Sequence, residues 1–178
     1  MVGSSRADHE TASVEPGQDL LIVGFGNDLA GDDGVGLEVV RLLRRWPRPS
    51  GVRVEEGGSD SLRLPGLWHG EARVWLVDAV VSGRPPGSLL RLGHEEILAV
   101  PQRHATVHHL SLPESLRWIF LAYPPMAAVR YELWGIEPLR VGLAAGLSPP
   151  VADAACSVAS ALRRALADRV SGAVGLPA

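Results

Sequence analysis

Residues 20–36 read LLIVGFGNDLAGDDGVG, in which a short apolar run is followed directly by a glycine-rich turn. The run from Leu20 to Val23 is unbroken, which is typical of a strand buried on both faces of a parallel sheet. Beyond the turn the apolar residues recur at helical spacing, and they are Val35, Val39, Leu42, Leu43 and Trp46. The segment therefore predicts a buried strand, a tight turn and a helix, which together form the first unit of an α/β fold.

The turn between this strand and this helix is rich in acidic residues. Asp32 and Asp33 stand at the predicted helix N-terminus, where the partial positive charge of the helix favours an ionised carboxylate. Either of them could simply cap the helix, but one aspartate is enough for that purpose. A dinucleotide-binding G-x-G-x-x-G motif is not completed, because Leu29 takes the place of the third glycine and Asp28 would add to the repulsion of a pyrophosphate. The turn therefore predicts a site for a cation.

Another acidic residue, Asp78, lies near the end of a second apolar strand. The segment from Arg73 to Val81 is predicted to be a buried strand, and Asp78 lies near its carboxyl end. Ligands of open parallel sheets bind at the carboxyl ends of the strands. We therefore expect Asp33 and Asp78 to share one edge of the sheet, although an aspartate in this position could also simply close a turn.

Three of the six histidines lie in residues 103–109, directly before a helix predicted to begin near Ser111. Of these, the adjacent pair His108 and His109 is the candidate source of a third ligand. Two carboxylates and one imidazole with open coordination positions suit nickel, zinc or iron(II). The set is incomplete for a structural metal site, which normally has four protein ligands. A further ligand would then come from water or from a substrate.

Strands and helices alternate along the rest of the chain. Further strands are predicted at Val52–Glu56, Ser88–Leu92 and Val129–Ile136, and a last helix runs from Leu147 to Val170. The connection before Ser88 is short, so this strand is expected to lie antiparallel to its neighbour. The predicted fold is a three-layer α/β/α sandwich around a mixed, mostly parallel five-stranded sheet. We expect a disordered leader over 1–18, one domain over 19–170 and a tail over 171–178.

Composition excludes several classes of function. The net charge of −3 and the lack of a basic block argue against a nucleic-acid partner. No apolar run approaches the roughly 20 residues that span a bilayer, so no membrane association is expected. The single cysteine, Cys156, excludes an internal disulfide and is predicted to pack among small residues of the last helix. Without a G-x-S-x-G motif, a covalent mechanism is not expected. A cytoplasmic monomer is the expectation.

Several short motifs follow one another along the chain in a characteristic order. They are Gly24–Asn27, Asp32–Gly36, Val77–Ala79, Thr106–Leu112, Gly135–Pro138 and Leu147–Pro149. In this order and spacing they resemble the motifs of the [NiFe]-hydrogenase maturation proteases, over nearly the whole predicted domain. The resemblance implies a phosphorylase/hydrolase-like fold and a cytoplasmic endopeptidase. Such an enzyme removes the C-terminal extension of the hydrogenase large-subunit precursor after nickel insertion, with the substrate's nickel as the recognition element.

The resemblance also implies the site residues. Carried over to this sequence, the nickel-contacting and catalytic positions are Asp33, Asp78 and His108. The first of these is Glu in some relatives. His108 is preferred over the adjacent His109 because the family's histidine stands three residues before a Gly-Leu pair, which is Ser111-Leu112 here. Asp32 or Asn27 would orient neighbouring groups, and the nickel would act either as a catalyst or as a checkpoint for cleavage.

Two other functions are considered, the first of which uses the same three residues. A nickel sensor or metallochaperone would bind the ion and cleave nothing. A zinc-dependent hydrolase of small molecules would hold its metal permanently and act without a protein partner. A maturation protease, in contrast, would have a site that is empty until the precursor arrives.

Overall fold

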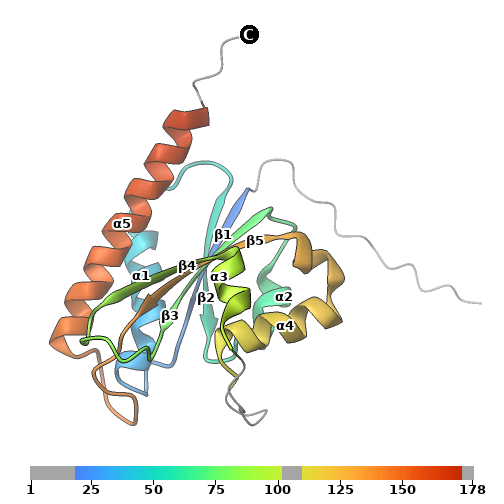
Figure 1. The fold of residues 1–178 in the computed structure, drawn as a ribbon. Coiled ribbons are helices and arrows are strands. Elements are labelled where there is room, and N and C mark those ends of the chain that lie inside the picture. Colours follow the sequence, from blue (N-terminus) through green and yellow to red (C-terminus); the bar gives the residue numbers. More distant parts are fainter. Residues whose placement is uncertain (1–18, 102–109, 174–178) are drawn as a thin grey trace, which may run out of the picture.

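Five strands form one sheet in the order β2-β1-β3-β5-β4 within the part of the chain that the computed structural model describes, residues 19–101 and 110–173 (Figure 1). The strands are β1 Leu20–Phe25, β2 Val52–Gly58, β3 Arg73–Ala79, β4 Leu89–Gly93 and β5 Arg130–Ile136. The helices are α1 Val35–Arg44, α2 Leu64–Leu67, α3 His94–Ala99, α4 Leu112–Ala122 and α5 Pro149–Ala173, and short 3-10 turns occupy Asp32–Gly34, Ser61–Arg63 and Pro124–Ala128.

Helices cover both faces of the sheet, as Figure 1 shows. On one face, α1 and α5 pack in a core that includes Ile22, Trp75 and Trp134. On the other face, α2, α3 and α4 pack in a core that includes Leu21 and Leu76. Consecutive residues of β1 thus enter opposite cores, which explains why the whole strand is apolar. The three-layer α/β/α sandwich is confirmed.

The sheet is mixed, as expected, but the neighbour of β4 differs from what its short connection to β3 suggests. Strand β4 pairs antiparallel with β5, and β5 pairs in parallel with β3, so β5 lies between the two. The connection crosses the end of β5, where the Val80 amide donates to the Ile136 carbonyl at 2.9 Å and the Gly87 amide to the Glu137 carbonyl at 2.8 Å. The turn after Asp78 is therefore attached to the end of β5.

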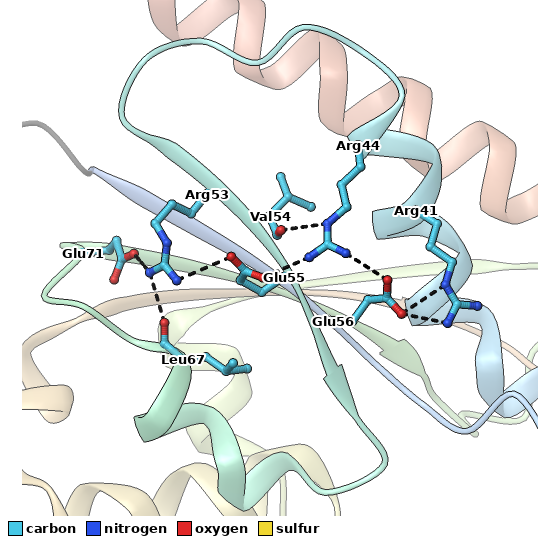
Figure 2. Close-up of polar contacts among 8 residues, drawn as sticks. All are labelled: Arg41, Arg44, Arg53, Val54, Glu55, Glu56, Leu67 and Glu71. Atoms are coloured by element: carbon cyan, nitrogen blue, oxygen red, sulfur yellow. Dashed lines mark hydrogen bonds and ion pairs between the residues drawn. The ribbon is translucent and has the colours of Figure 1, made fainter.

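Ion pairs line the edge strand β2 (Figure 2). Arg44 of α1 binds Glu55 and Glu56, each at 2.9 Å. Arg53, on the same strand, binds the fully buried Glu71. Charged side chains on an edge strand discourage pairing with the edge of another sheet. The alternation of apolar and charged residues in β2 is thus explained by its place at the edge.

The prediction for Cys156 is wrong, because its side chain is exposed on α5. The buried stripe of this helix includes Val151, Ala155, Val158 and Leu162. Position 156 follows Ala155 by one residue, which rotates it about 100° away from that stripe. None of the helices in the described ranges has the length and apolar character needed to cross a membrane.

Candidate functional site

Glycines let the first turn of α1 lie directly against the strand backbones. A Cβ atom at Gly36 would lie 2.2 Å from the Phe25 carbonyl oxygen and 2.4 Å from the Val77 carbonyl oxygen. A Cβ atom at Gly24 would lie 2.0 Å from the Gly36 carbonyl oxygen. Only glycine permits these approaches. The result is that the Asp32–Gly34 turn contacts β3, the strand that carries Asp78.

Asp28 is the first acid of the turn, and its charge is neutralised by α1. The Arg41 guanidinium donates to both oxygens of the Asp28 carboxylate at 2.8 Å. This bidentate bond holds the pKa of Asp28 below its usual value. Arg41 also binds Glu56 of β2 at 2.7 Å (Figure 2). Asp28 is therefore part of a surface ion-pair network.

Asp32 is fully buried and anchors a distant segment of the chain. Its Oδ2 atom accepts hydrogen bonds from the Leu139 amide at 2.9 Å, the Arg140 amide at 3.0 Å and the Ser148 hydroxyl at 2.8 Å. Its Oδ1 atom accepts from the Ser148 amide at 2.6 Å. Burial acts to raise the pKa of Asp32, but these hydrogen bonds outweigh burial and the pKa is lowered.

These hydrogen bonds show that Asp32 does not cap the helix that follows it. The side chain makes no capping bond to the turn or helix that follows it. It binds instead the segment that leads from β5 into α5, more than a hundred residues further along the chain. Asp32 thus joins the acidic turn to residues 139–148.

Asp33 and Asp78 form a pair of acids that interact electrostatically. Burial raises the pKa of Asp33, although a hydrogen bond from the Asn27 backbone opposes the shift. Burial and then the negative charge of Asp33 raise the pKa of Asp78 to about 7, against a hydrogen bond from the Ala79 amide at 2.8 Å. The pKa of Asp78 therefore depends in part on the charge of Asp33, and a cation placed between them would favour the ionised form of both.

The structure does not describe the histidine of the predicted site. His108 and His109 lie outside the described residues, so the choice between them stays a prediction. Within residues 19–101 and 110–173, no group of three or more histidine, cysteine, aspartate or glutamate side chains is arranged to hold a metal ion. The structure thus places Asp33 and Asp78 at one edge and leaves the third ligand as an expectation.

Glu137 is a residue of this edge to which the sequence pattern assigned no role. It is buried, and its Oε2 atom accepts hydrogen bonds from the Ser82 amide at 2.8 Å and the Ser82 hydroxyl at 2.6 Å. Its Oε1 atom accepts from the Gly83 amide at 3.2 Å. Glu137 thereby fixes the turn that follows Asp78. The only signal in the sequence was its place in the Gly135–Pro138 motif.

The fold and the site together define a class of protein. It is a three-layer α/β protein with two interacting carboxylates at the carboxyl edge of its sheet. A family model described as hydrogenase maturation protease matches residues 37–165. This chain belongs to the hydrogenase maturation proteases, which are endopeptidases. Confirmation of the family brings with it the predicted enzyme class, hydrolysis of peptide bonds.

Individual relatives agree with this assignment. Hydrogenase 2 maturation protease of Escherichia coli K12 is 29% identical over 161 residues, which cover 89% of this chain and 95% of that protein. Among solved structures, [NiFe] hydrogenase maturation protease HybD from Thermococcus kodakarensis matches with a TM-score of 0.68 and 26% identity, over 83% of this chain and 99% of that one. The hydrogenase maturating endopeptidase HybD from E. coli matches with a TM-score of 0.66 and 25% identity, over 83% and 93%.

Proposed function

We propose that this protein removes the C-terminal extension of a [NiFe]-hydrogenase large-subunit precursor after nickel has entered that subunit. In this proposal Asp33, Asp78 and His108 contact the nickel held by the precursor. The main observation that supports this proposal is which partners the acids Asp28, Asp32, Asp33 and Asp78 have. Asp28 is bound to Arg41 and Asp32 to backbone amides, so Asp33 and Asp78 are the acids left to meet a cation from outside.

The donor set fits nickel. Carboxylate oxygens and an imidazole nitrogen are suitable ligands, and three protein donors leave positions for ligands supplied by the precursor. Nickel held there would polarise the scissile carbonyl or activate a water molecule. Without a cation the pKa of Asp78 is raised to about 7, and nickel placed beside it would favour its ionised form. The negative charges of Asp33 and Asp78 would thus favour a precursor that holds the cation.

Membership of an endopeptidase family favours this function over the two alternatives. A metallochaperone would bind nickel without shortening the precursor. A small-molecule zinc hydrolase would be active without a partner. We also expect a cytoplasmic monomer, and light scattering of the purified chain would test its oligomeric state.

The test is cleavage of purified precursor, nickel-loaded or nickel-free. We expect the protein to shorten only the nickel-loaded form and to release one C-terminal peptide, identified by mass spectrometry. Asp78→Asn should abolish cleavage, whereas the matched control Asp28→Asn, in the neighbouring ion pair, should retain it. Absence of cleavage by the unaltered protein would overturn the proposal, and equal cleavage of both precursors would remove nickel as the recognition element. Normal cleavage by Asp78→Asn would remove Asp78 from the site.

A further inference from the structure

Exposed aliphatic side chains surround the edge of the sheet where Asp33 and Asp78 lie. They belong to three segments: the glycine turn, the turn after β3 and the connection from β5 to α5. We call them the apolar rim, and they are Leu29, Val81, Leu139, Val141 and Leu143, with exposed fractions of 71%, 74%, 55%, 56% and 96%. All three segments begin at the carboxyl ends of parallel strands, at the lower edge of the sheet in Figure 1.

The apolar rim is held in place by hydrogen bonds of the segments that carry it. The Ala144 amide donates to the Leu29 carbonyl at 3.1 Å, and the Gly142 amide donates to the Ala30 carbonyl at 3.2 Å. Asp32 binds the amides of residues 139 and 140, and Glu137 binds the turn that carries Ser82. These bonds attach the three segments to their surroundings, and the aliphatic side chains of the apolar rim remain exposed on them.

The apolar rim is close to the two acids in the sequence, and hydrogen bonds also join it to their neighbourhood. Leu29 precedes Asp33 by four residues, and Val81 follows Asp78 by three. The 139–143 segment is joined directly to Asp32, the neighbour of Asp33. The apolar rim therefore offers contacts to a polypeptide whose backbone lies at the two acids.

We infer that the apolar rim is the docking surface for the large-subunit precursor, and that it receives an apolar segment of that polypeptide beside the scissile bond. The inference rests on the proposed function. A fixed, exposed aliphatic cluster next to a protease site gains free energy when a protein substrate buries it. A second copy of this chain seated there would cover Asp33 and Asp78 and exclude the substrate.

The experiment compares two double variants of exposed residues. Leu29→Ser/Leu143→Ser alters the apolar rim. Trp118→Ser/Leu121→Ser is the control, because these side chains are 59% and 75% exposed on α4, a helix that carries no residue of the apolar rim. Both variants should keep the melting temperature of the unaltered protein. Kd and KM for nickel-loaded precursor and kcat for its cleavage are then measured.

We expect the rim variant to raise Kd and KM for the precursor at least tenfold, since two large aliphatic side chains lose their buried contacts. Its kcat should change less than twofold, and the control should match the unaltered protein. If the rim variant melts early, Val141→Ser alone is tested in the same way. Unchanged Kd and KM in a folded rim variant would overturn the inference. So would a rim variant that converts a dimer of this chain to monomers.

These outcomes are distinct from a failure of the proposed function. If the unaltered protein does not cleave nickel-loaded precursor, the proposed function is overturned, and this inference with it. If the unaltered protein and the rim variant cleave equally well at limiting precursor, the proposed function stands and only the docking surface is wrong.

Discussion

Replacing Asp78 by Asn should stabilise the metal-free protein while it abolishes cleavage. The carboxyl group is largely buried and lies beside the negative charge of Asp33, so its pKa is raised from 3.8 to about 7. The folded protein therefore holds this proton up to about pH 7, whereas the unfolded chain releases it near pH 4. Folding takes up a proton between these values, and the free energy of unfolding must fall as the pH rises through this window.

The size of the effect follows from the shift. A pKa change from 3.8 to about 7 corresponds to about 4 kcal/mol lost above pH 7, at 1.36 kcal/mol for each pH unit. Asn resembles the protonated acid, and its side-chain oxygen can still accept the bond from the Ala79 amide. Because water reaches part of this side chain, we expect the variant to gain between about 2 and 4 kcal/mol at pH 8.

The assay is urea unfolding at pH 4.5, 6 and 8 with a chelator present, so that no cation offsets the repulsion between the acids. The advantage of Asp78→Asn should be small at pH 4.5 and largest at pH 8. The exposed Asp153→Asn serves as the control and should change stability by no more than about 0.5 kcal/mol at any pH. A variant whose advantage does not grow between pH 4.5 and pH 8 would refute the raised pKa of Asp78.

Three further perturbations test other parts of the structure. Asp32→Ala should cost about 3–5 kcal/mol in urea unfolding, because it leaves the buried Ser148 amide and the part-buried amides of residues 139 and 140 without their acceptor. Asp28→Ala removes a surface ion pair and should cost about 1 kcal/mol or less; equal losses would contradict the anchoring role. Gly36→Ala should lower stability by about 3 kcal/mol, because its Cβ would meet two carbonyl oxygens; a melting temperature equal to that of the unaltered protein would show that the turn can move away. The Cys156 thiol should react with a thiol reagent in the folded protein at the rate of an unfolded control within a few fold, and protection until unfolding would place it in the core after all.

The order of the elements and the buried strands could be predicted because they depend on local patterns. An unbroken apolar run such as Leu20–Val23 requires burial on both faces, and a helical stripe requires one covered face. Cys156 was misplaced because a helix of many small residues has no sharp apolar boundary. The partner of β4 was not predictable from loop length, because β5, which comes later in the chain, inserts beside β3.

The sequence by itself determined that acids follow two parallel strands, and therefore that Asp33 and Asp78 share one edge of the sheet. Only the tertiary structure decided which acids of the turn are free to act, because Arg41 and the residue 139–148 segment, which bind Asp28 and Asp32, are brought there by folding. Identical carboxylates in one short turn acquire different roles because charge and hydrogen bonding depend on distance in space and not on position in the chain.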